Sequence, residues 1–85
     1  MTLEFVDNYI NKKILENKNF IKYTFYELRI KCNLSKEEVK QILELSKIYL
    51  EQKGYNIYFT GDEYIYQNKC KIVKDNELMV AIRQD

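Results

Sequence analysis

The sequence contains no histidine, no tryptophan and no proline, and its 85 residues include two glycines and two cysteines. Without histidine, the Ser–His and Cys–His pairs that activate a nucleophile cannot form. Zinc sites need histidine or closely spaced cysteines, and Cys32 and Cys70 stand far apart in the sequence. With only Gly54 and Gly61, no glycine-rich loop can cradle a phosphate. These absences predict a protein that is not an enzyme and that needs no metal, cofactor or small-molecule substrate.

Long apolar runs and targeting signals are also missing. No apolar run approaches the ~20 residues that a membrane span needs. The first residues carry Glu4 and Asp7 where a secretory signal is basic, and no apolar segment follows. We therefore expect a cytoplasmic protein without membrane contact. In that compartment two reduced cysteines are expected, although spacing leaves a disulfide open.

The composition that is present predicts one folded domain over residues 1–85. Hydrophobic residues make up 46% and aromatic residues 14% of the chain, which excludes a disordered tail. The net charge is +1, from 14 basic and 13 acidic side chains. Because many DNA-binding domains are strongly basic, any role of that kind requires positive charge gathered on one face.

Helical periodicity predicts a first helix over residues 3–17, with Thr2 as its N-cap. Leu3, Val6, Ile10 and Ile14 recur at helical spacing and predict a buried stripe. Other large side chains widen this stripe, and two interpretations of them stay open. They either complete the core or form a homodimer contact, because a small domain has little interior for them: Phe5, Tyr9 and Leu15.

Two more helices are predicted in the first half. A short extended segment, residues 19–23, is followed by the capping-box pattern Thr24–Glu27, which begins a brief helix ending near residue 32. Asn33 then tolerates the left-handed conformation of a turn. A second capping box, Ser35–Glu38, begins a long helix over residues 36–53 that Gly54 ends.

Beyond Gly54 the apolar period changes to two, which predicts strands. A hairpin turning at Gly61-Asp62 would place Phe59 opposite Tyr64 and Ile57 opposite Tyr66. A second hairpin would pair residues 69–74 with residues 78–82. The continuous apolar run at 78–82 predicts a central strand.

Two helices joined by a short turn and followed by a hairpin form a known supersecondary pattern. Its residues are Glu27-Leu28, Cys32-Asn33-Leu34-Ser35, Val39, Ile42-Leu43 and the segment Leu50–Tyr55. In these residues the chain resembles the winged helix-turn-helix family of DNA-binding proteins, over about residues 20–83. The resemblance implies an α+β fold with three helices followed by a small antiparallel sheet.

The resemblance also implies a function. Residues 36–53 would be the recognition helix, with these side chains reaching phosphates or base edges: Ser35, Lys36, Lys40, Gln41 and Lys47. The wing would be the densest basic segment: Asn68, Lys69, Lys71 and Lys74. We expect a homodimer on double-stranded DNA, since two copies add phosphate contacts. A small repressor or a plasmid or phage accessory factor for partition, replication or transfer fits this description.

Three alternatives stay open. The long helix also exposes Glu37, Glu44 and Glu51, so its polar face can be a solvated surface laced with ion pairs. The basic segment can be a charged edge strand that prevents aggregation. The near-neutral charge and the apolar surplus of the first helix and of residues 78–82 also suit a protein-interaction module, such as a phage-encoded inhibitor, that binds no DNA.

Overall fold

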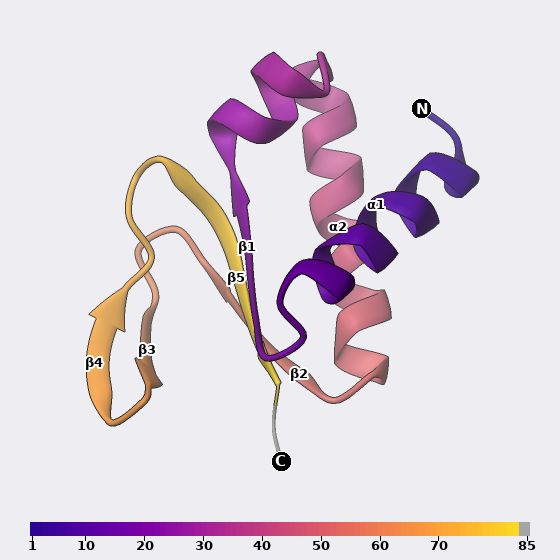
Figure 1. The fold of residues 1–85 in the computed structure, drawn as a ribbon. Coiled ribbons are helices and arrows are strands. Elements are labelled where there is room, and N and C mark those ends of the chain that lie inside the picture. Colours follow the sequence, from indigo (N-terminus) through magenta and orange to yellow (C-terminus); the bar gives the residue numbers. More distant parts are fainter. Residues whose placement is uncertain (84–85) are drawn as a thin grey trace.

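A computed structural model describes residues 1–83 of the chain (Figure 1). The elements follow the order α1 (Leu3–Glu16), β1 (Phe20–Thr24), η1 (Tyr26–Lys31), α2 (Lys36–Gln52), β2 (Tyr55–Phe59), β3 (Glu63–Tyr66), β4 (Lys69–Ile72) and β5 (Glu77–Arg83). The predicted α+β class, with three helices and antiparallel sheets, is confirmed. Within residues 1–83, none of the helices has the length and apolar character required to span a membrane.

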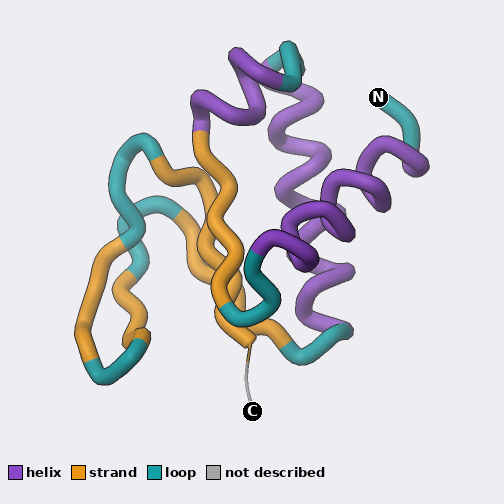
Figure 2. Tube along the Cα trace, viewed as in Figure 1, coloured by secondary structure: helices purple, strands orange, loops and turns teal. Residues whose placement is uncertain are grey.

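The molecule has three layers. In the middle lies an antiparallel sheet with the strand order β1-β5-β2. The helices cover one face of this sheet, and the separate β3–β4 hairpin lies on the other side (Figures 1 and 2). The last strand is therefore the central one, as its continuous apolar run predicts.

Each sheet face has its own apolar cluster. Alternate residues of the three strands point toward the helices and form the main core with them: Ile21, Tyr23, Tyr55, Ile57, Phe59, Met79 and Ala81. The intervening residues point toward the hairpin, where Val80 packs with Tyr64 and Val73. Phe20, Tyr58, Tyr66 and Ile82 surround this second cluster. The hairpin is thus tied to the back of the sheet by buried aromatic contacts.

The predicted helix starts are confirmed at two places and half confirmed at a third. Thr2 Oγ1 accepts from Phe5 N–H over 3.1 Å, and both bonds of the Ser35–Glu38 capping box are present. Thr24 Oγ1 accepts from Glu27 N–H over 3.2 Å, but the Glu27 carboxylate does not return to the cap. It binds Tyr9 and Lys13 of α1 instead, because those partners offer a hydroxyl and an ammonium group.

The predicted pairing of β2 with β3 is wrong. β2 pairs with β5, so that Ile57 lies opposite Ala81 and Phe59 opposite Met79. Gly61 has the expected positive φ of 92°, but it begins a crossing to the other face of the sheet. There Gly61 N–H donates to Val73 O over 2.9 Å. The apolar strand β5 has a hydrogen-bonded neighbour on each side, and it occupies the position beside β2 that was predicted for β3.

The predicted hairpin between residues 69–74 and 78–82 is also wrong. β4 pairs with β3, which places Tyr64 opposite Lys71 and Tyr66 opposite Lys69. The turn between them holds Gln67 and Asn68 at φ values of 52° and 63°. Two successive positive φ angles are the geometry that joins antiparallel strands tightly. This glycine-free turn was not predicted.

Residues of α1 differ from their predicted positions in two respects. Leu3 is 71% exposed although its spacing predicts burial, because it lies in the first turn beside an open groove. Tyr9, a candidate dimer contact, is buried in the main core, which contradicts that assignment. Leu15 is 87% exposed, and Phe5 is half-buried against Tyr9.

Candidate nucleic-acid interface

Helix α2 is attached to the domain along one side. Val39, Ile42, Ser46 and Leu50 are buried against the sheet and the other helices. The opposite side is not covered by any element within residues 1–83, and its polar residues are exposed. The Ser35 cap and the Asn33 turn, with φ of 54°, fix the point where the helix leaves η1.

The exposed side of α2 divides into three longitudinal strips, because residues seven apart lie within about 20° of each other on a helix. One strip is basic, with Lys40 and Lys47 and with Lys36 one turn before them. The middle strip is acidic, with Glu37, Glu44 and Glu51. The third is neutral and partly apolar, with Gln41, Leu45, Ile48 and Gln52.

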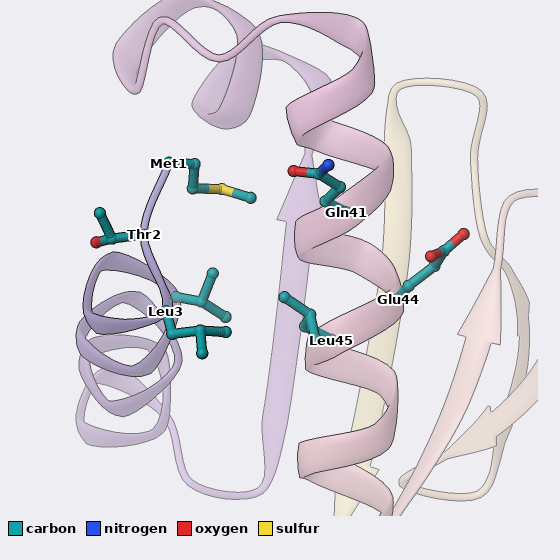
Figure 3. A pocket seen from close by; sticks show the side chains of 7 residues that line it. Met1, Thr2, Leu3, Gln41, Glu44 and Leu45 are labelled. Atoms are coloured by element: carbon teal, nitrogen blue, oxygen red, sulfur yellow. The ribbon is translucent and has the colours of Figure 1, made fainter.

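Figure 3 gives the direction of these strips. Leu45 points toward α1, whereas Glu44 points away from it. Because Lys40 and Lys47 follow Glu44 around the helix on the side away from Leu45, the basic strip lies on the flank of α2 remote from α1. Positive charge is therefore gathered on one flank even though the whole face is balanced.

Most of the predicted helix residues are free to bind a partner. Lys36, Lys40, Gln41 and Lys47 are exposed, whereas the Ser35 hydroxyl is used in the capping box. Lys47 lies 3.9 Å from Glu51, and both side chains are about half exposed, so the pair is weak. Lys40 and Glu44, also four residues apart, form no ion pair in the described part of the chain.

The predicted wing segment does not lie beside α2. Asn68 is in the turn of the hairpin, and Lys69 and Lys71 are exposed on β4. Directly paired residues of antiparallel strands point to the same side, so these lysines share the side of Tyr66 and Tyr64. That side faces the sheet. The structure therefore separates the segment from α2 by the sheet layer.

A pocket of about 540 Å³ opens where the hairpin meets the back of the sheet. Lys71 and Lys74 line it together with Lys22 of β1 and Glu77 of β5. Lys22 Nζ lies 3.3 Å from Glu77 Oε2, and Lys74 N–H donates to Glu77 Oε1 over 2.9 Å. Burial alone raises the pKa of Glu77, but these two contacts outweigh it and lower the pKa overall. Sequence analysis missed Lys22, because its only signal is its alternation with Ile21 and Tyr23.

A cluster of polar side chains between α1 and η1 holds η1 to the first helix. Glu27 accepts from the Tyr9 hydroxyl and from Lys13 Nζ, which lies 3.0 Å away. Burial works against both charges, since it raises the pKa of Glu27 and lowers the pKa of Lys13. Cys32, nearby, is half-buried with a pKa that burial raises, and it is not linked to the exposed Cys70.

A groove runs between α1 and α2 on the other flank (Figure 3). Its two pockets share Leu3, Val6 and Leu45, and Ile48 extends one of them. Leu3 and Ile48 are 71% and 55% exposed. Contiguous exposed apolar side chains of this kind mark interaction surfaces.

No protein-family model, no curated protein and no solved structure matches the chain. Within residues 1–83, no group of three or more cysteine, aspartate or glutamate side chains could hold a metal ion.

Proposed function

We propose that the chain binds double-stranded DNA, with α2 as the recognition helix of a winged helix-turn-helix domain. The observation that carries this proposal is the free basic flank of α2, formed by Lys36, Lys40 and Lys47. The chain order supports it, because α1, β1, η1, α2 and β2 precede a strand that inserts between β1 and β2. The resemblance of the turn residues to that family points to the same recognition helix, although the strand pairing predicted with it was different.

The side chains of this flank suit a DNA groove. The three lysine ammonium groups neutralise phosphates, whereas Gln41, a residue type that can form a bidentate contact with adenine, lies in the neutral strip beyond the acidic one. The acidic strip of Glu37, Glu44 and Glu51 reduces affinity and its salt dependence, because each carboxylate near a phosphate is repelled. If DNA is contacted through the basic flank, the acidic strip lies at the edge of the protein–DNA contact.

We further propose that two copies bind one site. A single domain of charge +1 makes few phosphate contacts, and a second copy doubles them. Such a protein suits a repressor or an accessory factor that marks a partition, replication or transfer site. Of the predicted dimer residues, Phe5 and Leu15 remain accessible, whereas Tyr9 does not.

The test is a salt titration of duplex binding, measured by fluorescence anisotropy with genomic fragments. The native protein is expected to bind at low salt and to lose affinity as salt rises. Lys40→Glu/Lys47→Glu is expected to weaken binding by about tenfold or more. Selection of bound fragments then gives the target sequence.

A matched control separates the flank from overall charge. Lys12→Glu/Lys18→Glu changes two exposed lysines outside α2, and each pair of substitutions lowers the net charge by four, from +1 to −3. The control is expected to weaken binding by less than about threefold. Equal losses in both variants, or no binding of native protein to any duplex at low salt, contradict the proposal.

A protein-interaction module is the second candidate, and the groove between α1 and α2 favours it. The charged side chains that line its two pockets are Asp7 and Glu44, both acidic. A second copy would bring like charges together, so the groove fits a partner helix with apolar anchors flanked by lysine or arginine.

A synthetic amphipathic helix with leucine anchors and lysine flanks tests this candidate. Its binding is expected to be lost in Ile48→Ser and kept in Ile65→Ser, a matched change at a hairpin residue that is 72% exposed. The same helix with glutamate flanks should not bind. Equal binding of both helices would contradict the candidate.

A further inference from the structure

The cleft between the hairpin and the back of the sheet holds more positive charge than the protein compensates. Lys22, Lys71 and Lys74 converge on it from β1, β4 and the segment before β5. Within residues 1–83, the one ion pair among these lysines joins Lys22 to Glu77. Lys71 and Lys74 form no ion pair with a carboxylate in this part of the chain.

The convergence follows from the strand register. Lys22 lies opposite Val80, and Lys71 lies opposite Tyr64, whose ring is buried against that same side of the sheet. Both lysines are thus directed into the space between the two layers. Lys74 is held beside them, because its N–H donates to the Glu77 carboxylate.

The carboxylate in the cleft already has two partners. One Glu77 oxygen faces Lys22 Nζ at 3.3 Å and the other accepts from Lys74 N–H at 2.9 Å. Within residues 1–83 no ion pair joins Lys71 or the Lys74 ammonium group to this carboxylate, although the charge of Lys74 helps to lower the pKa of Glu77. Two like charges at the mouth of a cleft repel each other unless an anion lies between them.

We propose that this cleft binds a phosphate group. Two free ammonium groups supply point charges of the kind that proteins use for phosphate. Phe20 and Tyr64, which also line the 540 Å³ pocket, provide an aromatic wall for whatever carries the phosphate. The phosphate belongs either to a small phosphorylated molecule or to a nucleic-acid strand. The site goes beyond the proposed duplex contact, because α2 lies on the opposite face of the sheet.

The test is a titration of the labelled protein followed by amide chemical shifts in NMR spectra. Inorganic phosphate is expected to give saturating shifts around residues 70–74 with a Kd of roughly 1–10 mM. Sodium chloride at equal ionic strength is the control for screening. AMP and a single-stranded oligothymidylate are titrated next, and the tighter of the two identifies the source of the phosphate.

Matched variants show which lysines are responsible for the phosphate-induced chemical shifts. Lys71→Gln/Lys74→Gln is expected to abolish saturation, whereas Lys12→Gln/Lys18→Gln makes the same charge change at exposed residues that do not line the pocket and keeps it. Glu77→Gln retains an acceptor for Lys74 N–H while removing the negative charge, and it is expected to tighten phosphate binding by about threefold. Saturation that persists without Lys71 and Lys74, or that chloride reproduces, overturns the proposal.

The two proposals fail separately. In Lys40→Glu/Lys47→Glu the phosphate response is expected to remain while duplex binding is lost. If the native protein binds duplex DNA but shows no saturating response to phosphate, AMP or the oligonucleotide, only the cleft proposal is contradicted. If it binds phosphate in the cleft but does not bind duplex DNA, only the proposed function of α2 is contradicted.

Discussion

The Tyr23 hydroxyl donates a hydrogen bond to Ser46 Oγ over 2.9 Å, and both side chains are fully buried. The bond joins β1 to α2 inside the main core. A buried hydroxyl is costly unless it is paired, so the two residues depend on each other. The pair therefore fixes how the proposed recognition helix sits on the sheet.

Removing either hydroxyl is expected to destabilise the protein. Tyr23→Phe and Ser46→Ala should each lower the free energy of unfolding by about 1–2 kcal/mol, because each leaves a buried partner without a bond. The double variant should lose less than the sum of the two single losses. Urea denaturation of the four proteins measures this coupling, and strictly additive losses would contradict it.

The burial of Tyr23 leads us to expect a loss of stability at alkaline pH. Burial raises the pKa of Tyr23 to about 12, although the Ser46 hydrogen bond works in the opposite direction. In the unfolded chain a tyrosine titrates near pH 10. The stabilisation from the neutral phenol is therefore complete below about pH 10 and is lost as the pH rises toward 12.

Thermal unfolding across this pH range provides the measurement. Tyr23→Phe should lose less stability between pH 10 and pH 12 than the native protein. Tyr26→Phe, at a residue that is 60% exposed, serves as the control. An identical alkaline loss in native protein and Tyr23→Phe would contradict the prediction.

For Glu77 we expect a loss of stability at acid pH. Its pKa in the folded protein is lowered, because the Lys74 N–H and Lys22 contacts outweigh the opposing effect of burial. Its stabilisation is complete above the unfolded pKa of about 4.3 and is lost as the pH falls through the folded pKa. Glu77→Gln should cost about 1–2 kcal/mol at pH 7 and flatten the stability curve between about pH 5 and pH 3.

Acid titrations of unfolding by circular dichroism measure this difference. Glu63→Gln changes an exposed glutamate of the hairpin and should leave the curve nearly unchanged. A Glu77→Gln protein as acid-sensitive as the native protein would show that the carboxylate contributes nothing to the transition.

The hairpin turn can be improved. Gln67 and Asn68 hold φ values of 52° and 63°, which asparagine followed by glycine adopts at lower cost. Gln67→Asn/Asn68→Gly should raise the free energy of unfolding by about 0.5–1 kcal/mol. Asn76→Gly, at a residue without positive φ, should not stabilise the protein. Urea denaturation distinguishes the two, and a destabilised double variant would contradict the expected turn geometry.

Local signals predicted the helices well. Thr2, Ser35 and Asn33 act within a few residues of their own positions, and each has the predicted role. The long helix differs by one residue, since Lys53 follows its last turn rather than belonging to it. These features depend on backbone donors close in sequence, which the residue order alone determines.

Strand partners could not be predicted in the same way. The alternation of Tyr55, Ile57 and Phe59 predicted a strand but was equally compatible with β3 or β5 as its neighbour. The choice depends on contacts between distant segments, such as Tyr64 with Val80 across two layers. The phosphate cleft was missed for the same reason, because Lys22 and Lys71 meet only after the hairpin has crossed the sheet.

The position of β5 has a consequence for how the protein is made. Within residues 1–83, β1 and β2 each pair with β5 and with no other strand, so neither can form a ladder until residues 77–83 are available. A nascent chain lacking this segment exposes Tyr23, Phe59 and their apolar neighbours to the surrounding solution. Contacts between segments so distant in sequence form slowly, and the chain is open to aggregation until they do. Ribosome-bound chains arrested before residue 77 should therefore be protease-sensitive, with protection gained only when the final strand emerges.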